Sequence, residues 1–123
     1  MKIQESAENY LETILALSLD KPYVRSIDIA NELGFSKPSV SVAMKNLRNS
    51  GHIRVDENGH ITLAPPGKKI AEMIYERHRL LSQWLESLGV SKETASEDAC
   101  RIEHVISEES FAAIKDHLKQ TSV

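Results

Sequence analysis

Three residues of the kinds that bind transition metals stand close together near the end of the chain, in the stretch Cys100-Arg101-Ile102-Glu103-His104. We expect a helix here, over residues 97–106, and residues at i, i+3 and i+4 are neighbours on a helix surface. A thiolate, a carboxylate and an imidazole together suit a divalent transition metal better than magnesium or calcium. The spacing therefore predicts a metal site. A buried apolar cysteine, a surface acid and a polar residue on the helix flank are the alternative roles.

Two other predicted helices carry further donors. Asn9 and Glu12 are one turn apart on the first helix of the chain, and His78 lies within a long helix between Arg77 and Arg79. Glu12 has an alternative role as a solvated acid, and His78 as a polar residue at an interface. Because a folded helical core can bring donors from three helices together, we include all of them as candidate ligands.

The first half of the chain predicts a helix-turn-helix. Apolar residues recur at a helical period over residues 6–19. Ser26 is a suitable N-cap for a short helix over residues 27–33, and Gly34 is a suitable stop. Ser36 then caps a second helix, with a buried stripe of three residues. That stripe is Val40, Met44 and Leu47.

Two short segments of alternating hydropathy, residues 52–55 and 60–63, flank the sequence Asp56-Glu57-Asn58-Gly59. Asn-Gly between such segments is a strong signal for a β-hairpin. A helix-turn-helix followed by a hairpin is a winged helix. We therefore predict a mainly α fold with a small β wing, in which a winged helix-turn-helix precedes an α-helical domain.

The segment Pro65-Pro66-Gly67 is predicted to separate a DNA-binding domain of residues 1–66 from a helical domain of residues 67–123. In the second domain we expect a long helix over residues 68–88, stopped by Gly89. A helical segment starting near Ser91 and two amphipathic helices, over residues 97–106 and 110–118, should follow.

A helix fits the major groove of DNA, and the side chains of its first turn reach base edges. The first turn of the second predicted helix lacks Arg, Asn and Gln, so we expect modest direct readout and more specificity from dimer spacing and DNA shape. The predicted DNA contacts are that turn, basic residues for the phosphates, and the wing tip. They are Arg25, Ser36, Lys37, Pro38, Ser39, Ser41, Lys45, Arg48, Asn58 and His60.

The charge distribution agrees with nucleic acid binding, although the net charge is −3. Residues 1–20 sum to −3, residues 21–79 to +4 and residues 80–123 to −4. A basic centre can present a phosphate-binding face. Random scatter of solvated charge, or a winged helix used for protein association, are the alternatives.

Length and composition exclude several classes. The 123 residues suit one compact domain, or a DNA-binding unit with a small assembly unit. A single cysteine excludes an intrachain disulfide and suits a reducing cytosol. The first residues lack the apolar run of a signal peptide, and no segment is long enough to span a bilayer. We expect a cytoplasmic protein without a membrane partner.

Four segments resemble the diphtheria-toxin-repressor family of metal-dependent transcriptional regulators. They are residues 8–14, residues 27–34 with 36–41, residues 77–81 and residues 97–107, and the resemblance runs over about residues 5–120. The family's SH3-like third domain has no counterpart in this chain. The chain is therefore similar in build to the shorter, manganese-regulator branch.

The resemblance implies a homodimeric repressor, in which the second domain binds metal and dimerises. By position, Cys100, Glu103 and His104 match ligands of the iron-type primary site, and His78 matches a ligand shared by both branches. Glu12 matches a carboxylate ligand of the manganese branch.

Three further positions depart from the family pattern. Asn9 falls where the iron branch has methionine and the manganese branch aspartate. Ser82 and Ser96 fall where the iron branch has ancillary ligands. This mixed set leaves Fe(II) and Mn(II) as the leading ions, and Zn(II) or Co(II) should also bind in vitro.

The resemblance thus implies a repressor that binds operator DNA when Fe(II) or Mn(II) is bound and controls genes for metal uptake. The alternative is a metal-independent winged-helix regulator that senses a small organic ligand in its helical half. An enzyme with Cys100 as nucleophile and His104 as base is a third possibility. No orienting group or oxyanion-hole signal accompanies that pair, so we expect no enzymatic activity.

Overall fold

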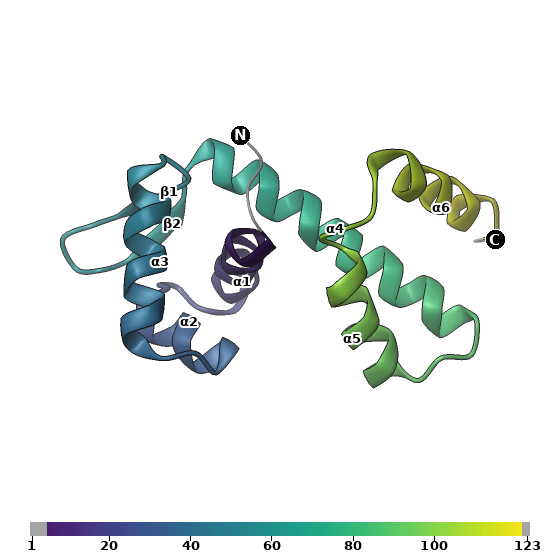
Figure 1. Ribbon diagram of the computed structural model, residues 1–123, viewed down its shortest axis with the longest axis horizontal. Coiled ribbons are helices and arrows are strands. Elements are labelled where there is room, and N and C mark those ends of the chain that lie inside the picture. Colours follow the sequence, from purple (N-terminus) through teal and green to yellow (C-terminus); the bar gives the residue numbers. More distant parts are fainter. Residues whose placement is uncertain (1–4, 122–123) are drawn as a thin grey trace. The chain divides into compact units, whose positions relative to one another are not determined.

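The computed structural model describes residues 5–121, which form two compact units with a boundary between Met73 and Ile74 (Figure 1). The elements follow in the order α1 (Glu5–Asp20), α2 (Ser26–Leu33), α3 (Lys37–Asn49), β1 (Ile53–Val55), β2 (Ile61–Leu63), α4 (Pro65–Ser87), α5 (Lys92–Ile102) and α6 (Glu108–Thr121). The predicted fold, mainly helical with a two-stranded wing, is confirmed. No helix in this stretch has the length and apolar character needed to cross a membrane.

In the first unit, α2 and α3 form the predicted helix-turn-helix. Gly34 ends α2 in the left-handed conformation, with φ 69°, which glycine adopts without a steric penalty. Ser36 caps α3 as predicted, because its Oγ accepts a hydrogen bond from the backbone N–H of Ser39. The cap of α2 is Arg25 and not Ser26; the Arg25 backbone N–H donates to Asp28 Oδ2 at 2.9 Å.

The wing is a two-stranded antiparallel hairpin in which Ile53 pairs with Leu63 and Val55 with Ile61. The backbone N–H of Ile61 also donates to Val24 O at 2.7 Å, so the extended segment before α2 lies along β2. Both isoleucines are buried in one apolar core. Its other members come from α1, the extended segment before α2, α2, α3 and the start of α4: Tyr10, Leu11, Ile14, Val24, Ile29, Ala30, Val40, Met44, Leu47 and Ala71.

The start of α4 differs from the prediction, because Pro65, Pro66 and Gly67 belong to its first turn. Proline is tolerated there, since the first backbone N–H groups of a helix have no partner within it. Gly67 is required by a close approach: a Cβ at this position would lie 2.0 Å from the backbone O of His52. The segment therefore joins α4 directly to the start of the wing.

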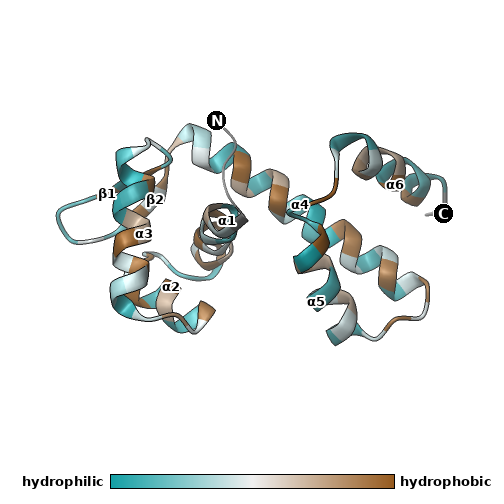
Figure 2. Ribbon diagram, viewed as in Figure 1, coloured by the Kyte–Doolittle hydropathy of each residue, from teal (hydrophilic) through white to brown (hydrophobic). Residues whose placement is uncertain are grey.

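In the second unit, α5 and α6 pack on the second half of α4, whose turns alternate between hydrophilic and hydrophobic residues (Figure 2). Leu81, Ala99 and Phe111, one from each helix, are the buried residues of this smaller core. The helix predicted over residues 97–106 begins earlier, after the N-cap Ser91, and ends at Ile102. The predicted metal-ligand cluster of Cys100, Glu103 and His104 consequently extends beyond the end of α5.

Candidate metal centre and DNA-binding surface

The predicted ligands Cys100, Glu103 and His104 lie together at the end of α5. Although the helix ends at Ile102, the chain keeps a helical turn: the N–H of Glu103 donates to Ala99 O at 2.9 Å. The N–H of Ile106 likewise donates to Ile102 O at 3.0 Å. One ligand atom from each of the three side chains therefore lies within 4.8 Å of the others.

Glu103 is the centre of this cluster and is 0 % exposed. Its Oε2 forms a hydrogen bond with His78 Nδ1 at 3.1 Å, and its Oε1 lies 3.5 Å from His104 Nε2. Among the described residues, Oε1 has no hydrogen-bond partner. A buried carboxylate oxygen without a hydrogen bond is costly, so a cation beside Oε1 would stabilise the site. The donor set and this oxygen both fit a divalent transition metal.

The alternative roles considered for the three residues disagree with their burial. Glu103 is no surface acid, and the side chain of His104 is only 2 % exposed. Cys100 is exposed, so it is not a small apolar core residue. A thiol at the surface beside a buried carboxylate and a buried imidazole is available to a metal ion arriving from solvent.

His78 joins this cluster from α4 through its hydrogen bond to Glu103. Asn9 and Glu12 belong to α1 in the first unit, where both side chains are half-buried and face the same side of the helix at i, i+3. The backbone O of Asn9 accepts a hydrogen bond from Thr13 Oγ1. Their assignment as ligands stays a prediction.

Nearly all the predicted DNA contacts are exposed, and those of α3 follow its outer face. The Ser36 hydroxyl, however, caps α3 and donates to Ser39 Oγ at 2.8 Å, so both serines already have partners. Val42 lies one turn beyond Pro38 and is 60 % exposed, so it is a further candidate contact on this face. The sequence signal for Val42 is that it is an apolar residue four positions after Pro38, and therefore on the same face of α3.

His60 is the last residue of the wing loop, which it closes by accepting a hydrogen bond from the backbone N–H of Asp56 at 3.1 Å. His60 directly precedes β2, and its ring stacks on Tyr23 with centroids 4.1 Å apart. Its Nε2 lies 3.3 Å from Arg25 Nη2, and its Nδ1 lies 3.4 Å from Asp56 Oδ2. The backbone N–H of His60 donates to Asp56 and holds the pKa of that carboxyl below its ordinary value. Arg25 and His60 are thus one group at the end of the wing loop, supported by Tyr23.

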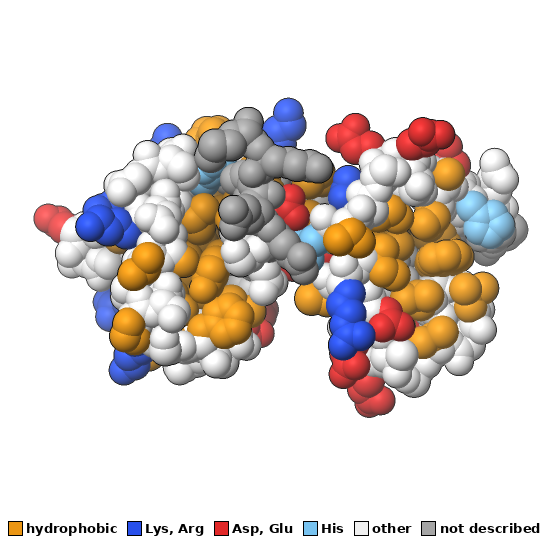
Figure 3. Space-filling view, in the orientation of Figure 1, with side chains coloured by type: hydrophobic (Ala, Val, Ile, Leu, Met, Phe, Trp, Pro, Cys, Tyr) orange, Lys and Arg blue, Asp and Glu red, His pale blue; other side chains and the backbone are white. Residues whose placement is uncertain are grey.

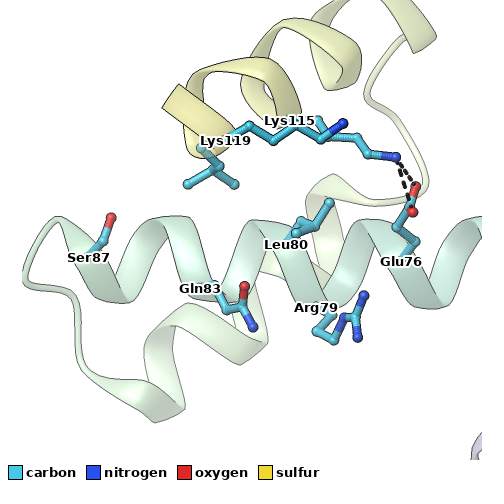
Figure 4. Close-up of a pocket in the computed structure, with 8 residues that line it drawn as sticks. Glu76, Arg79, Leu80, Gln83, Ser87, Lys115 and Lys119 are labelled. Atoms are coloured by element: carbon cyan, nitrogen blue, oxygen red, sulfur yellow. Dashed lines mark hydrogen bonds and ion pairs between the residues drawn. The ribbon is translucent and has the colours of Figure 1, made fainter. Parts of the chain in front are cut away.

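A separate groove of about 540 Å³ lies between α4 and α6 (Figure 4). Lys115 on α6 reaches across it to Glu76 on α4 and bonds to both carboxylate oxygens at 3.2 Å. Arg79, Gln83 and Lys119 also line it. None of the predicted metal ligands lines this groove.

A winged helix together with a helical unit that carries clustered metal donors defines a metal-responsive DNA-binding protein. Residues 2–61 match the family model described as iron dependent repressor, N-terminal DNA binding domain. Residues 64–123 match the model for the metal binding and dimerisation domain of the same repressors. The chain belongs to this iron-dependent, or diphtheria-toxin, repressor family, and it is a metal-dependent transcriptional repressor and not an enzyme.

Three relatives illustrate the match. The transcriptional regulator MntR of Salmonella typhimurium is 36 % identical over 110 residues, which are 89 % of this chain and 70 % of that protein. The HTH-type transcriptional regulator MntR of Lysinibacillus sphaericus is 34 % identical over 111 residues, 90 % of this chain and 80 % of that protein. The solved structure of a manganese-dependent transcriptional repressor in complex with manganese superposes with a TM-score of 0.83 at 28 % identity; the match covers 92 % of this chain and 52 % of that one.

Proposed function

We propose that the protein is a homodimeric repressor that binds double-stranded operator DNA in the cytoplasm when Fe(II) or Mn(II) is bound, and that it controls genes for metal uptake. In this proposal residues 1–66 bind DNA, and residues 67–123 bind metal and dimerise. The single observation that carries it is the buried Glu103 carboxylate, whose Oε1 lacks a hydrogen-bond partner within the described chain and lies beside Cys100 and His104.

The proposed ligands are His78, Cys100, Glu103 and His104, with Asn9 and Glu12 added on the family resemblance. A bound divalent ion supplies the positive centre that these donors lack. Cys100 must lose its proton to ligate, so we expect binding to weaken as the pH falls. Glu103 needs no such change when it is ionised, and His78 already holds one of its oxygens.

The identity of the ion follows less directly from the donors. A relative of known structure binds manganese, as its description states, and the thiol of Cys100 makes this site softer than an all-carboxylate site. Divalent affinity rises from Mn(II) through Fe(II) to Co(II) in most protein sites, so supply and geometry select the physiological ion. Zn(II) and Co(II) are therefore useful probes in vitro, whichever ion is used in the cell.

The homodimer is supported by exposed apolar surface on the second unit. Hydrophobic side chains gather on one face of it (Figure 3). Val105 is 75 % exposed, and Ile102, Ile106 and Ile114 are only partly buried. A second copy would cover such surface and carry a second recognition helix; half-sites of operator DNA are read about 34 Å apart or at multiples of that distance.

A titration of operator binding tests the proposal. Fluorescence anisotropy is followed with Mn(II), Fe(II), Co(II) and Zn(II) under anaerobic conditions, with metal stoichiometry measured on the same samples. A strong switch needs metal binding about 10⁴-fold tighter in the DNA-binding state than in the other state. Glu103→Gln should abolish the response, whereas Glu97→Gln, an exposed acid on the same helix, should retain it. DNA binding that is unaffected by a chelator and by Glu103→Gln would overturn the proposal.

A further inference from the structure

A buried arginine lies next to the metal cluster. Arg77 is 7 % exposed, and it belongs to the buried face of α4 because it lies three residues after Ile74 and four before Leu81, both fully buried. An arginine at such a position must find partners for its five N–H groups. Its location in a row of apolar core residues therefore calls for a specific role.

Two of its hydrogen bonds go to the backbone that carries the ligands. Arg77 Nη1 donates to Glu103 O and to Ile106 O, each at 3.1 Å. Because α5 ends at Ile102, the last carbonyls of the helix and the turn after it have no continuing helix to bond with. Arg77 supplies the donor from α4, and its guanidinium also lies 5.6 Å from the ring centroid of Phe111 on α6.

We infer that Arg77 is a positioning residue for the metal site, an inference that rests on the proposed function. By fixing the carbonyls of Glu103 and Ile106, it holds the turn from which the Glu103 and His104 side chains project. Glu103 can then present Oε1, which accepts no hydrogen bond, without reorganising its backbone. Outer partners of this kind orient ligands and typically change metal affinity by about 10–100-fold.

Because Arg77 is positively charged, the direction in which metal affinity changes on its substitution tests the inference. A buried guanidinium close to a site for a divalent cation repels that cation, so removal of its charge alone would tighten metal binding. Removal of its two hydrogen bonds would loosen the turn and weaken metal binding. The structure shows both bonds directed at the ligand turn, so we expect the loss of positioning to dominate.

The experiment measures Co(II) affinity of the full-length chain by competition with a chromophoric chelator. We expect Arg77→Met to weaken Co(II) binding about tenfold or more. Arg77→Lys, which keeps a charge and a donor, should rescue part of this loss. The matched control is Arg79→Met, which removes an exposed cation two residues along α4 and should stay within about twofold of wild type.

Two readouts separate positioning from a general loss of stability. In metal-free protein, the amides of Val105 and Ile106 should exchange faster in both Arg77 variants, whereas amides within α6 should not. The charge-transfer band between Cys100 and Co(II) should also change its position or intensity. If Arg77→Met does not fold, Arg77→Lys carries the test with the same signs. Unchanged or tighter Co(II) binding by the folded variants would overturn the inference.

Glu103→Gln, titrated alongside, identifies which proposal has failed. If wild type and Glu103→Gln bind Co(II) equally, the proposed metal site is wrong. If Glu103→Gln loses Co(II) while Arg77→Met retains it, only the role of Arg77 is wrong.

Discussion

The two units differ in how their polar groups are satisfied. In the described part of the first unit, Thr13 is the only buried polar residue, and its hydroxyl donates to the backbone of Asn9. The charged side chains of that unit interact at the surface, as Lys21 does with Asp28. The described part of the second unit buries Arg77 and Glu103, and it contains every buried side-chain atom found without a hydrogen-bond partner: Arg77 Nε, Ser82 Oγ and Glu103 Oε1.

This difference indicates that a bound ligand could satisfy buried polar atoms in the second unit, whereas the described part of the first unit has no such atom. An apolar core whose helices are capped by nearby residues needs no ligand to supply hydrogen-bond partners. Buried polar atoms without partners each cost about 1–3 kcal/mol, so a fold that retains them is stabilised by whatever satisfies them. Four measurements test this difference between the two units.

The largest effect is expected from truncating one core residue in each unit. Ile29 and Leu81 are both fully buried, and replacing either with alanine should cost about 2–5 kcal/mol of unfolding free energy. Hydrogen exchange by mass spectrometry should locate the loss in the first unit for Ile29→Ala and in the second for Leu81→Ala. Equal acceleration throughout the chain by either variant would show that the units are not separate in stability.

Metal should stabilise wild type by about 2.7 kcal/mol when free Mn(II) is 100 times its dissociation constant. Urea unfolding with and without Mn(II) measures this gain. Glu103→Gln should remove it, yet leave the metal-free protein as stable as wild type or more so, because a neutral amide avoids the burial of an ionised carboxylate. A metal-free loss above about 1 kcal/mol would mean that the wild-type carboxylate is already fully satisfied.

A smaller effect is expected at the contact between Tyr23 and His60. Tyr23→Ala removes the ring that stacks on His60 and should weaken operator binding by about 1 kcal/mol, measured by anisotropy on metal-saturated protein. Tyr23→Phe keeps the ring and should bind like wild type. Equal losses in both variants would instead point to a direct contact of the phenol hydroxyl with DNA.

The smallest effect is a dependence of stability on pH at the start of α2. The Arg25 backbone N–H, and then Lys21, lower the pKa of Asp28 below its ordinary value of 3.8, against the opposing effect of desolvation. The folded state thus favours the carboxylate, so this stabilisation is present above the unfolded pKa and is lost as the pH falls through the folded one. Asp28→Asn should cost about 0.5 kcal/mol at neutral pH and nothing in strong acid. A constant difference at every pH in urea unfolding would contradict this.

Sequence reasoning succeeded where the signal is local. Three such predictions are confirmed: Gly34 ends α2, Ser36 caps α3, and Asn58-Gly59 lies in the turn of the wing. Each depends only on the backbone conformation or side chain of the residue itself. The clustering of Cys100, Glu103 and His104 was also visible, because one helical turn brings i, i+3 and i+4 together whether or not the helix continues.

It failed where the partner is distant in the sequence. Just after α5 ends, Arg77 donates hydrogen bonds to the carbonyls of Glu103 and Ile106. These residues lie 26 and 29 positions after Arg77 in the sequence. The ring of His60 stacks on Tyr23, which lies before α2 and far from the wing loop in the sequence. The sequence predicts that the long helix begins at Lys68, whereas α4 begins at Pro65, with Gly67 against the backbone of His52. Sequence spacing alone contains none of these contacts.

The contact between Gly67 and the backbone of His52 has a mechanical consequence. At this joint the first turn of α4 meets the start of the wing without an intervening side chain, and the N–H of Ala64 donates to the same His52 oxygen at 3.0 Å. Side chains absorb small displacements by changing rotamer, but two backbones in contact have no such freedom. A displacement of the wing therefore displaces the first turn of α4 as well. A bulkier residue at position 67 would separate the two backbones.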